Sequence, residues 1–77
     1  MSTESRVNRI LVDLLEVDES EVVATAKLRD DLGIDDLHGE ELHQMLEEEF
    51  KLLIPGENFQ QWLTVRDVWD YVEEHQR

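Results

Sequence analysis

Cysteine is absent from this chain of 77 residues, and it has only one proline and three glycines. The lack of cysteine excludes disulfide bonds and thiolate metal sites. Stability must therefore come from side-chain packing, alone or with the help of a partner. Apolar residues make up 40% of the chain, which is enough for one core but not for two. We expect a single domain over residues 1–77.

Basic residues are also scarce. Lys and Arg number 7 against 20 Asp and Glu, for a formal net charge of -13. Such a charge repels nucleic-acid phosphates and anionic lipids and favours proteins with basic surfaces. Acidity can serve solubility alone, but here the acids gather around one predicted helix, which favours a role in recognition.

Long hydrophobic runs are missing as well. No stretch approaches the length of a membrane-spanning helix, and the opening sequence MSTESRVNRI lacks the apolar run of a signal peptide. We expect a cytoplasmic protein that does not insert into membranes.

The apolar residues that are present follow a helical period. The first stripe predicts a helix over residues 3–16. It consists of Val7, Ile10, Leu11, Leu14 and Leu15. A long connection follows, with a short helical turn predicted near Ser20 and a left-handed residue at Gly33 that ends the turn formed by Leu28 and Leu32.

Three more helices are predicted after this connection. Residues 37–51 contain a second stripe, Pro55 and Gly56 break the pattern, and a short helix near residues 57–62 follows. Thr64 with Asp67 resembles a capping box that starts the last helix. The two longer stripes comprise Leu42, Met45, Leu46 and Phe50, then Val65, Val68, Trp69 and Val72. The fold class is all-α: a small four-helix bundle with a long first connection and a short third helix.

One stretch carries a family signature. It reads Asp31-Leu32-Gly33-Ile34-Asp35-Asp36-Leu37, followed by Glu40-Glu41-Leu42 and Leu46-Glu47-Glu48-Glu49-Phe50. It resembles the region D-L-G-x-D-S-L and the acidic helix after it in acyl carrier proteins, and later landmarks at Ile54-Pro55 and Thr64-Val65 agree. The resemblance extends from Val7 to Val72 and implies the four-helix bundle of that family.

The resemblance also implies a site. In this family, phosphopantetheine is attached to the serine that opens the second helix, and acidic residues of that helix bind partner enzymes. Asp36 occupies the serine position here, so we expect no covalent phosphopantetheine and no other cofactor. The residues expected to dock partners are Asp35, Leu37, Glu40, Glu41, Glu47 and Glu48.

Asp36 admits two interpretations. Asp is a good N-cap, so the residue can simply start the helix at a site that is inactive. Alternatively, its carboxylate imitates the charge of the missing phosphodiester and preserves docking without cargo. Gly39, in the first turn of the same helix, costs helix stability, and either close approach by a partner or loss of constraint would explain it.

Metal and enzyme sites find little support. His38 and His43 are five residues apart and therefore lie about 140° apart around a helix, unlike a zinc-binding pair. We predict no specific metal site, although Asp30, Asp31 and Asp35 could bind a divalent cation weakly. No nucleophilic cysteine, phosphate-binding loop or nucleophile elbow is present, so we expect no catalysis.

Three functions remain in order of preference. The first is a carrier-like module without cargo that binds or regulates proteins with basic surfaces, such as carrier-dependent enzymes. The second is a true carrier of fatty-acid, polyketide or peptide biosynthesis in which the serine has been substituted. The third is an unrelated helix bundle that responds to cations or binds membranes peripherally, which the lack of a basic amphipathic face disfavours.

Overall fold

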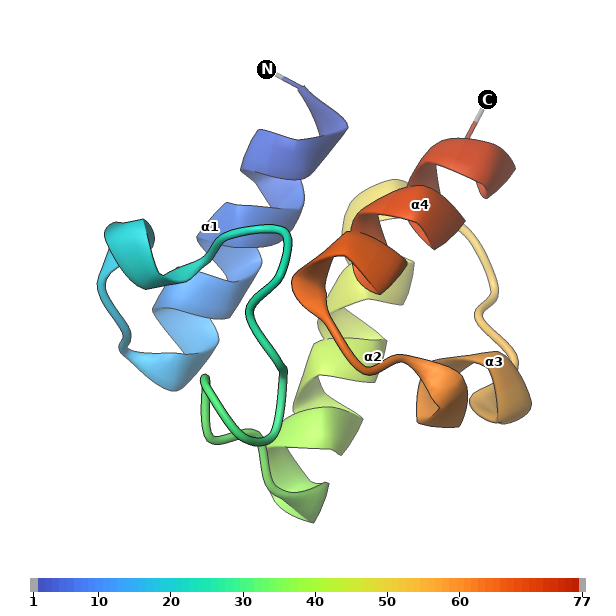
Figure 1. The fold of residues 1–77 in the computed structure, drawn as a ribbon. Helices are drawn as coiled ribbons and strands as arrows, with labels where there is room; N and C mark the ends of the chain where they lie inside the picture. Colours follow the sequence, from blue (N-terminus) through green and yellow to red (C-terminus); the bar gives the residue numbers. More distant parts are fainter. Residues whose placement is uncertain (1, 77) are drawn as a thin grey trace.

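The first apolar stripe forms α1, Thr3–Leu15, in a computed structural model that describes residues 2–76 (Figure 1). The Ser2 hydroxyl accepts a hydrogen bond of 3.0 Å from the backbone N–H of Ser5 and caps the first turn. The helix ends where Glu16 takes a left-handed conformation, with φ 56°. Its predicted bounds are correct to within one residue.

The long connection after α1 places apolar side chains in the core. A 3-10 turn, η1, spans Glu19–Glu21 at the predicted position. Gly33 has φ +74°, which confirms the predicted left-handed residue. The buried residues of the connection are Val22, Ala26, Leu28, Leu32 and Ile34. This segment therefore forms part of the core, although most of it lies outside any helix.

The second stripe forms α2, Asp36–Phe50, which runs through the middle of the molecule (Figure 1). The helix ends at Lys51, which also takes a left-handed conformation, φ 56°. Its buried residues are Gly39, Leu42, Leu46 and Phe50. Met45 of the predicted stripe is only partly buried against the core.

Two further helices complete the chain: α3, Gly56–Gln61, and α4, Val65–His75. The capping box predicted from Thr64 and Asp67 is confirmed. The Asp67 carboxylate accepts hydrogen bonds from the backbone N–H groups of Leu63 and Thr64, at 2.8 and 3.0 Å. This cap fixes the point at which the chain enters α4.

Helix α1 packs against both α2 and α4. Two backbone hydrogen bonds tie the first connection to the start of α4: Leu28 N–H to Leu63 C=O at 2.9 Å, and Val65 N–H to Ala26 C=O at 3.0 Å. Residues 2–76 contain an isolated β-bridge but no strand, so the predicted all-α class is confirmed. None of the helices described here is both long and apolar enough to span a membrane.

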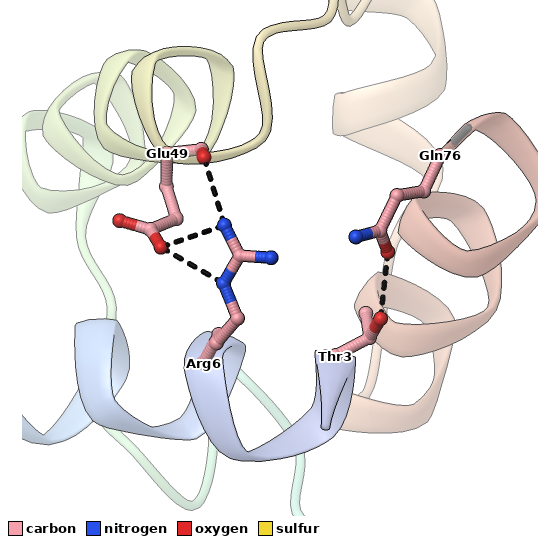
Figure 2. A network of polar contacts seen from close by, with 4 residues as sticks. All are labelled: Thr3, Arg6, Glu49 and Gln76. Carbon is pink, nitrogen blue, oxygen red and sulfur yellow. Dashed lines mark hydrogen bonds and ion pairs between the residues drawn. The ribbon is translucent and has the colours of Figure 1, made fainter. Parts of the chain in front are cut away.

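Arg6 joins the start of α1 to the end of α2 (Figure 2). Its guanidinium donates to the Glu49 carboxylate at 2.9 Å and to the Glu49 backbone carbonyl at 3.0 Å, and it lies 4.5 Å from the centre of the Phe50 ring. A positive charge at the C-terminal end of a helix is stabilising, because the last carbonyls have no partner within the helix. Arg6 therefore caps the C-terminal end of α2.

The core makes a first prediction. Leu46 is fully buried (0% exposed), so Leu46→Ala should lower the free energy of unfolding by about 2–5 kcal/mol, through lost burial and the cavity left behind. Leu53 is 86% exposed, and Leu53→Ala should change it by less than about 0.5 kcal/mol. Urea denaturation measures both, and similar losses in the two variants would contradict this core.

Candidate functional site

The candidate site begins where α2 starts. Asp35 has an extended backbone, and its carboxylate accepts a hydrogen bond of 2.8 Å from the backbone N–H of His38. Asp35 is therefore the N-cap, and Asp36 is already the first helical residue. The prediction that Asp36 caps the helix is wrong, because the cap must reach the N–H three residues ahead and Asp35 is the residue that does so. The sequence alone could not decide between Asp35 and Asp36 as the N-cap, because both are aspartates.

The Asp35 carboxyl has a pKa below the ordinary value of an aspartate. The main cause is the hydrogen bond from the backbone N–H of His38, and the nearby His38 ring adds to it, whereas desolvation acts in the opposite direction. The His38 Nδ1 atom lies 3.2 Å from the Asp35 carboxylate. Asp35 thus stays ionised to low pH and holds the first turn of α2 in place.

Asp36 projects into solvent, with its side chain 97% exposed. It forms an ion pair with Arg29, whose guanidinium lies 3.3 Å from the carboxylate and whose side chain is 70% exposed. Such an exposed pair contributes little to stability, because water screens both charges. The carboxylate is therefore accessible to a partner at the very start of α2.

A groove lies beside Asp36, between α2 and α3. It consists of two adjoining hollows of about 200 and 440 Å³ that share Arg29, Gly39, Phe59 and Gln60. We call it the α2–α3 groove. Its remaining lining residues are Leu28, Ile34 and Trp62 in the smaller hollow, and Asp36, Glu40, His43 and Gly56 in the larger. Sequence reasoning missed this groove, because its walls come from three separate segments.

Gly39 forms part of the groove wall facing α3. A Cβ atom at this position would lie 3.6 Å from the Phe59 ring, in ordinary van der Waals contact. Close approach by a partner, considered for Gly39 from the sequence, stays a prediction. The space would accept alanine, so glycine is not required here by packing.

The predicted docking residues of α2 are not equivalent. Glu40, Glu41 and Glu48 are exposed, and the apolar side chain of Leu37 is also exposed, at 65%. We call these four residues the docking face. Glu47 differs, because its side chain is only 29% exposed and its carboxylate accepts a hydrogen bond of 2.9 Å from the backbone N–H of Ile54.

The acids considered for cation binding are not gathered into a site. Asp30 and Asp31 are exposed, and the Asp31 carboxylate accepts a hydrogen bond of 2.7 Å from the Lys27 N–H. Within residues 2–76, no three side chains of the metal-binding types are grouped so that they could hold an ion. Weak cation binding at Asp30, Asp31 and Asp35 stays a prediction.

Comparison with known proteins identifies the family. The family model described as a phosphopantetheine attachment site matches residues 5–72. The fold is similar to a solved structure from Mycobacterium tuberculosis named as a putative acyl carrier protein, with a TM-score of 0.89, 33% sequence identity, and coverage of 95% of this chain and 97% of the other. The chain belongs to the acyl carrier protein family. The resemblance found in the sequence is confirmed.

Membership of the acyl carrier protein family defines the broad activity. These proteins carry groups and interact with enzymes, and they are not enzymes themselves, which confirms the expectation of no catalysis. The family normally bears phosphopantetheine. In this chain no residue from Ala26 to Leu63 has a hydroxyl side chain.

The lowered pKa of Asp35 makes a second prediction. The stability it confers is complete above about pH 4, the pKa of an unfolded aspartate, and is lost as the pH falls through the lower folded value. Asp35→Asn keeps a capping oxygen but removes the charge. Its melting temperature should fall below that of the unsubstituted protein above about pH 4, and the difference should shrink in stronger acid.

Asp13→Asn is the control for this experiment, because Asp13 is an exposed aspartate of α1. We expect a smaller and less pH-dependent change in melting temperature for this variant. If Asp35→Asn and Asp13→Asn show the same pH profile, the special role of the Asp35 cap is wrong.

Proposed function

We propose that this member of the acyl carrier protein family carries no phosphopantetheine and works as an acidic interaction or regulatory module. One observation carries the proposal: Asp36, with its side chain 97% exposed, is the first residue of α2, at the position that the sequence aligns with the family's attachment serine. We also propose a cytoplasmic location and partner enzymes with basic surfaces.

The chemistry of attachment supports the absence of the arm. Transfer of phosphopantetheine from coenzyme A requires an alcohol oxygen that attacks the pyrophosphate and forms a stable phosphodiester. A carboxylate oxygen would instead form an acyl phosphate, which hydrolyses readily. The nearest hydroxyl side chains in sequence are Thr25 and Thr64, and Thr64 is part of the α4 cap. The site therefore does not suit the cofactor of the family.

The docking face supports retained recognition. Glu40, Glu41 and Glu48 are exposed acids on the same helix as the exposed Leu37, which suits a partner that offers cations and an apolar contact. The net charge of -13 would also steer a basic partner towards the chain. At the start of α2, the Asp36 carboxylate supplies negative charge where the family has its phosphodiester.

A second candidate function is a true carrier whose serine is substituted in this sequence. The observation in its favour is the preserved architecture, with a TM-score of 0.89 to the mycobacterial structure over 95% of this chain. In that case, restoring serine at position 36 should restore attachment. The same experiment therefore examines both candidates.

This experiment compares the chain with its Asp36→Ser variant. Each is incubated with coenzyme A and a phosphopantetheinyl transferase of broad specificity, and intact mass is recorded. We expect no change for the chain itself and a gain of one phosphopantetheine for Asp36→Ser. Asp31→Ser, which adds a hydroxyl in the preceding loop, is the control and should stay unmodified. A gain on the unsubstituted chain would refute the proposal.

The docking face makes a separate prediction, tested in the Asp36→Ser background. Charge reversal by Glu41→Lys or Glu48→Lys should reduce the kcat/KM of transferase modification by roughly fivefold each, because each change replaces an attraction with a repulsion. Glu74→Lys alters an exposed acid of α4 and should have little effect. Equal effects at all three positions would show that only net charge matters.

A further inference from the structure

The loop between α2 and α3, residues 51–55, is held by two side chains of α2. The Glu47 carboxylate accepts a hydrogen bond of 2.9 Å from the backbone N–H of Ile54. The His43 Nε2 atom lies 2.6 Å from the backbone carbonyl oxygen of Ile54 and 3.4 Å from the Glu47 carboxylate. Because a carbonyl oxygen can only accept, the Nε2 atom must carry the hydrogen of this bond. Both backbone polar groups of Ile54 are thus satisfied from α2.

These contacts extend to α3. The His43 ring stacks on the Phe59 ring, with centroids 4.9 Å apart and planes 20° apart. Phe59 in turn contacts Trp62, at 5.1 Å between centroids. Both aromatic rings line the smaller hollow of the α2–α3 groove. His43 therefore contacts the loop on one side and the groove-lining ring of α3 on the other.

Helix α3 has little else to hold it. It has six residues, none of them buried, and Pro55 at its N-terminus provides no side-chain cap. Phe59 is its only half-buried residue. A helix this short is not stable by itself, so its position depends on Phe59 and on the buried Ile54 that precedes it (2% exposed).

We propose that His43 and Glu47 form a latch that holds α3 against α2 and sets the width of the α2–α3 groove. When the latch is closed, the N–H and the C=O of Ile54 are both bound and Phe59 lies over Gly39. When either side chain is lost, loop 51–55 and α3 open together while the remaining helices stay packed. This device does not depend on whether position 36 carries a cofactor.

Amide hydrogen exchange measured by NMR tests the latch. In Glu47→Ala the Ile54 N–H loses its acceptor, and its exchange should accelerate about tenfold or more, the effect of losing a hydrogen bond to a charged group. The Phe59 N–H should accelerate with it. Exchange at both positions should be insensitive to low urea, because the opening is local, whereas exchange at Leu11 in α1 should rise with urea.

Three further variants sharpen this experiment. His43→Leu should also accelerate exchange at Ile54. Glu47→Gln keeps an acceptor oxygen and should have a smaller effect than Glu47→Ala. It allows the latch to be tested even if Glu47→Ala does not fold. Glu48→Ala changes the exposed neighbour and should leave Ile54 exchange at the original rate. The Trp62 indole resonance should shift in both latch variants, while that of Trp69 should not.

Defined outcomes would overturn the latch. One is an unchanged exchange rate at Ile54 in both Glu47→Ala and His43→Leu. Another is an Ile54 rate that rises with urea as steeply as that of Leu11, which would mean that the whole chain unfolds. If the Trp62 resonance does not shift in the latch variants, the claim that the latch sets the width of the α2–α3 groove is wrong.

Discussion

Hydrogen bonds from backbone N–H groups to carboxylates organise every connection of this chain. Glu21 accepts from Asp18 in the turn after α1, Asp31 from Lys27 in the long loop, and Asp35 from His38 at the start of α2. Glu47 accepts from Ile54 before α3, and Asp67 from Leu63 and Thr64 before α4. A charged acceptor makes such a bond stronger than a neutral one. The acidity of the chain therefore shapes its fold as well as its surface.

The periodic part of the fold could be predicted from the sequence, because apolar spacing reports directly on burial. Val7, Ile10 and Leu11 of the first stripe are buried as expected. Leu42, Leu46 and Phe50 of the second stripe are also buried. The cap of α4 was also predictable, since Thr64 and Asp67 stand alone as candidates. The cap of α2 was not predictable, because Asp35 and Asp36 are equally good N-cap residues and only the backbone geometry shows which of them is the cap.

The candidate site could be located from the sequence but not built from it. The family signature marked the start of α2, yet nothing in the spacing of residues revealed the groove. Arg29, Gly39 and Phe59 meet there from a loop and two helices, and such contacts depend on tertiary packing. Tertiary packing also explains why the role of Glu47 was not predicted. It looks like a docking acid in the sequence, but its carboxylate accepts a hydrogen bond from the Ile54 N–H in the structure.

The chain ends have a practical consequence. The hydroxyl of Thr3 donates a hydrogen bond of 2.6 Å to the side-chain oxygen of Gln76 (Figure 2). The start of α1 therefore lies beside the end of α4. The start of α2 lies at the opposite end of the molecule (Figure 1). A tag or solid support is therefore best attached at one of these ends, because both lie on the side of the molecule away from the start of α2.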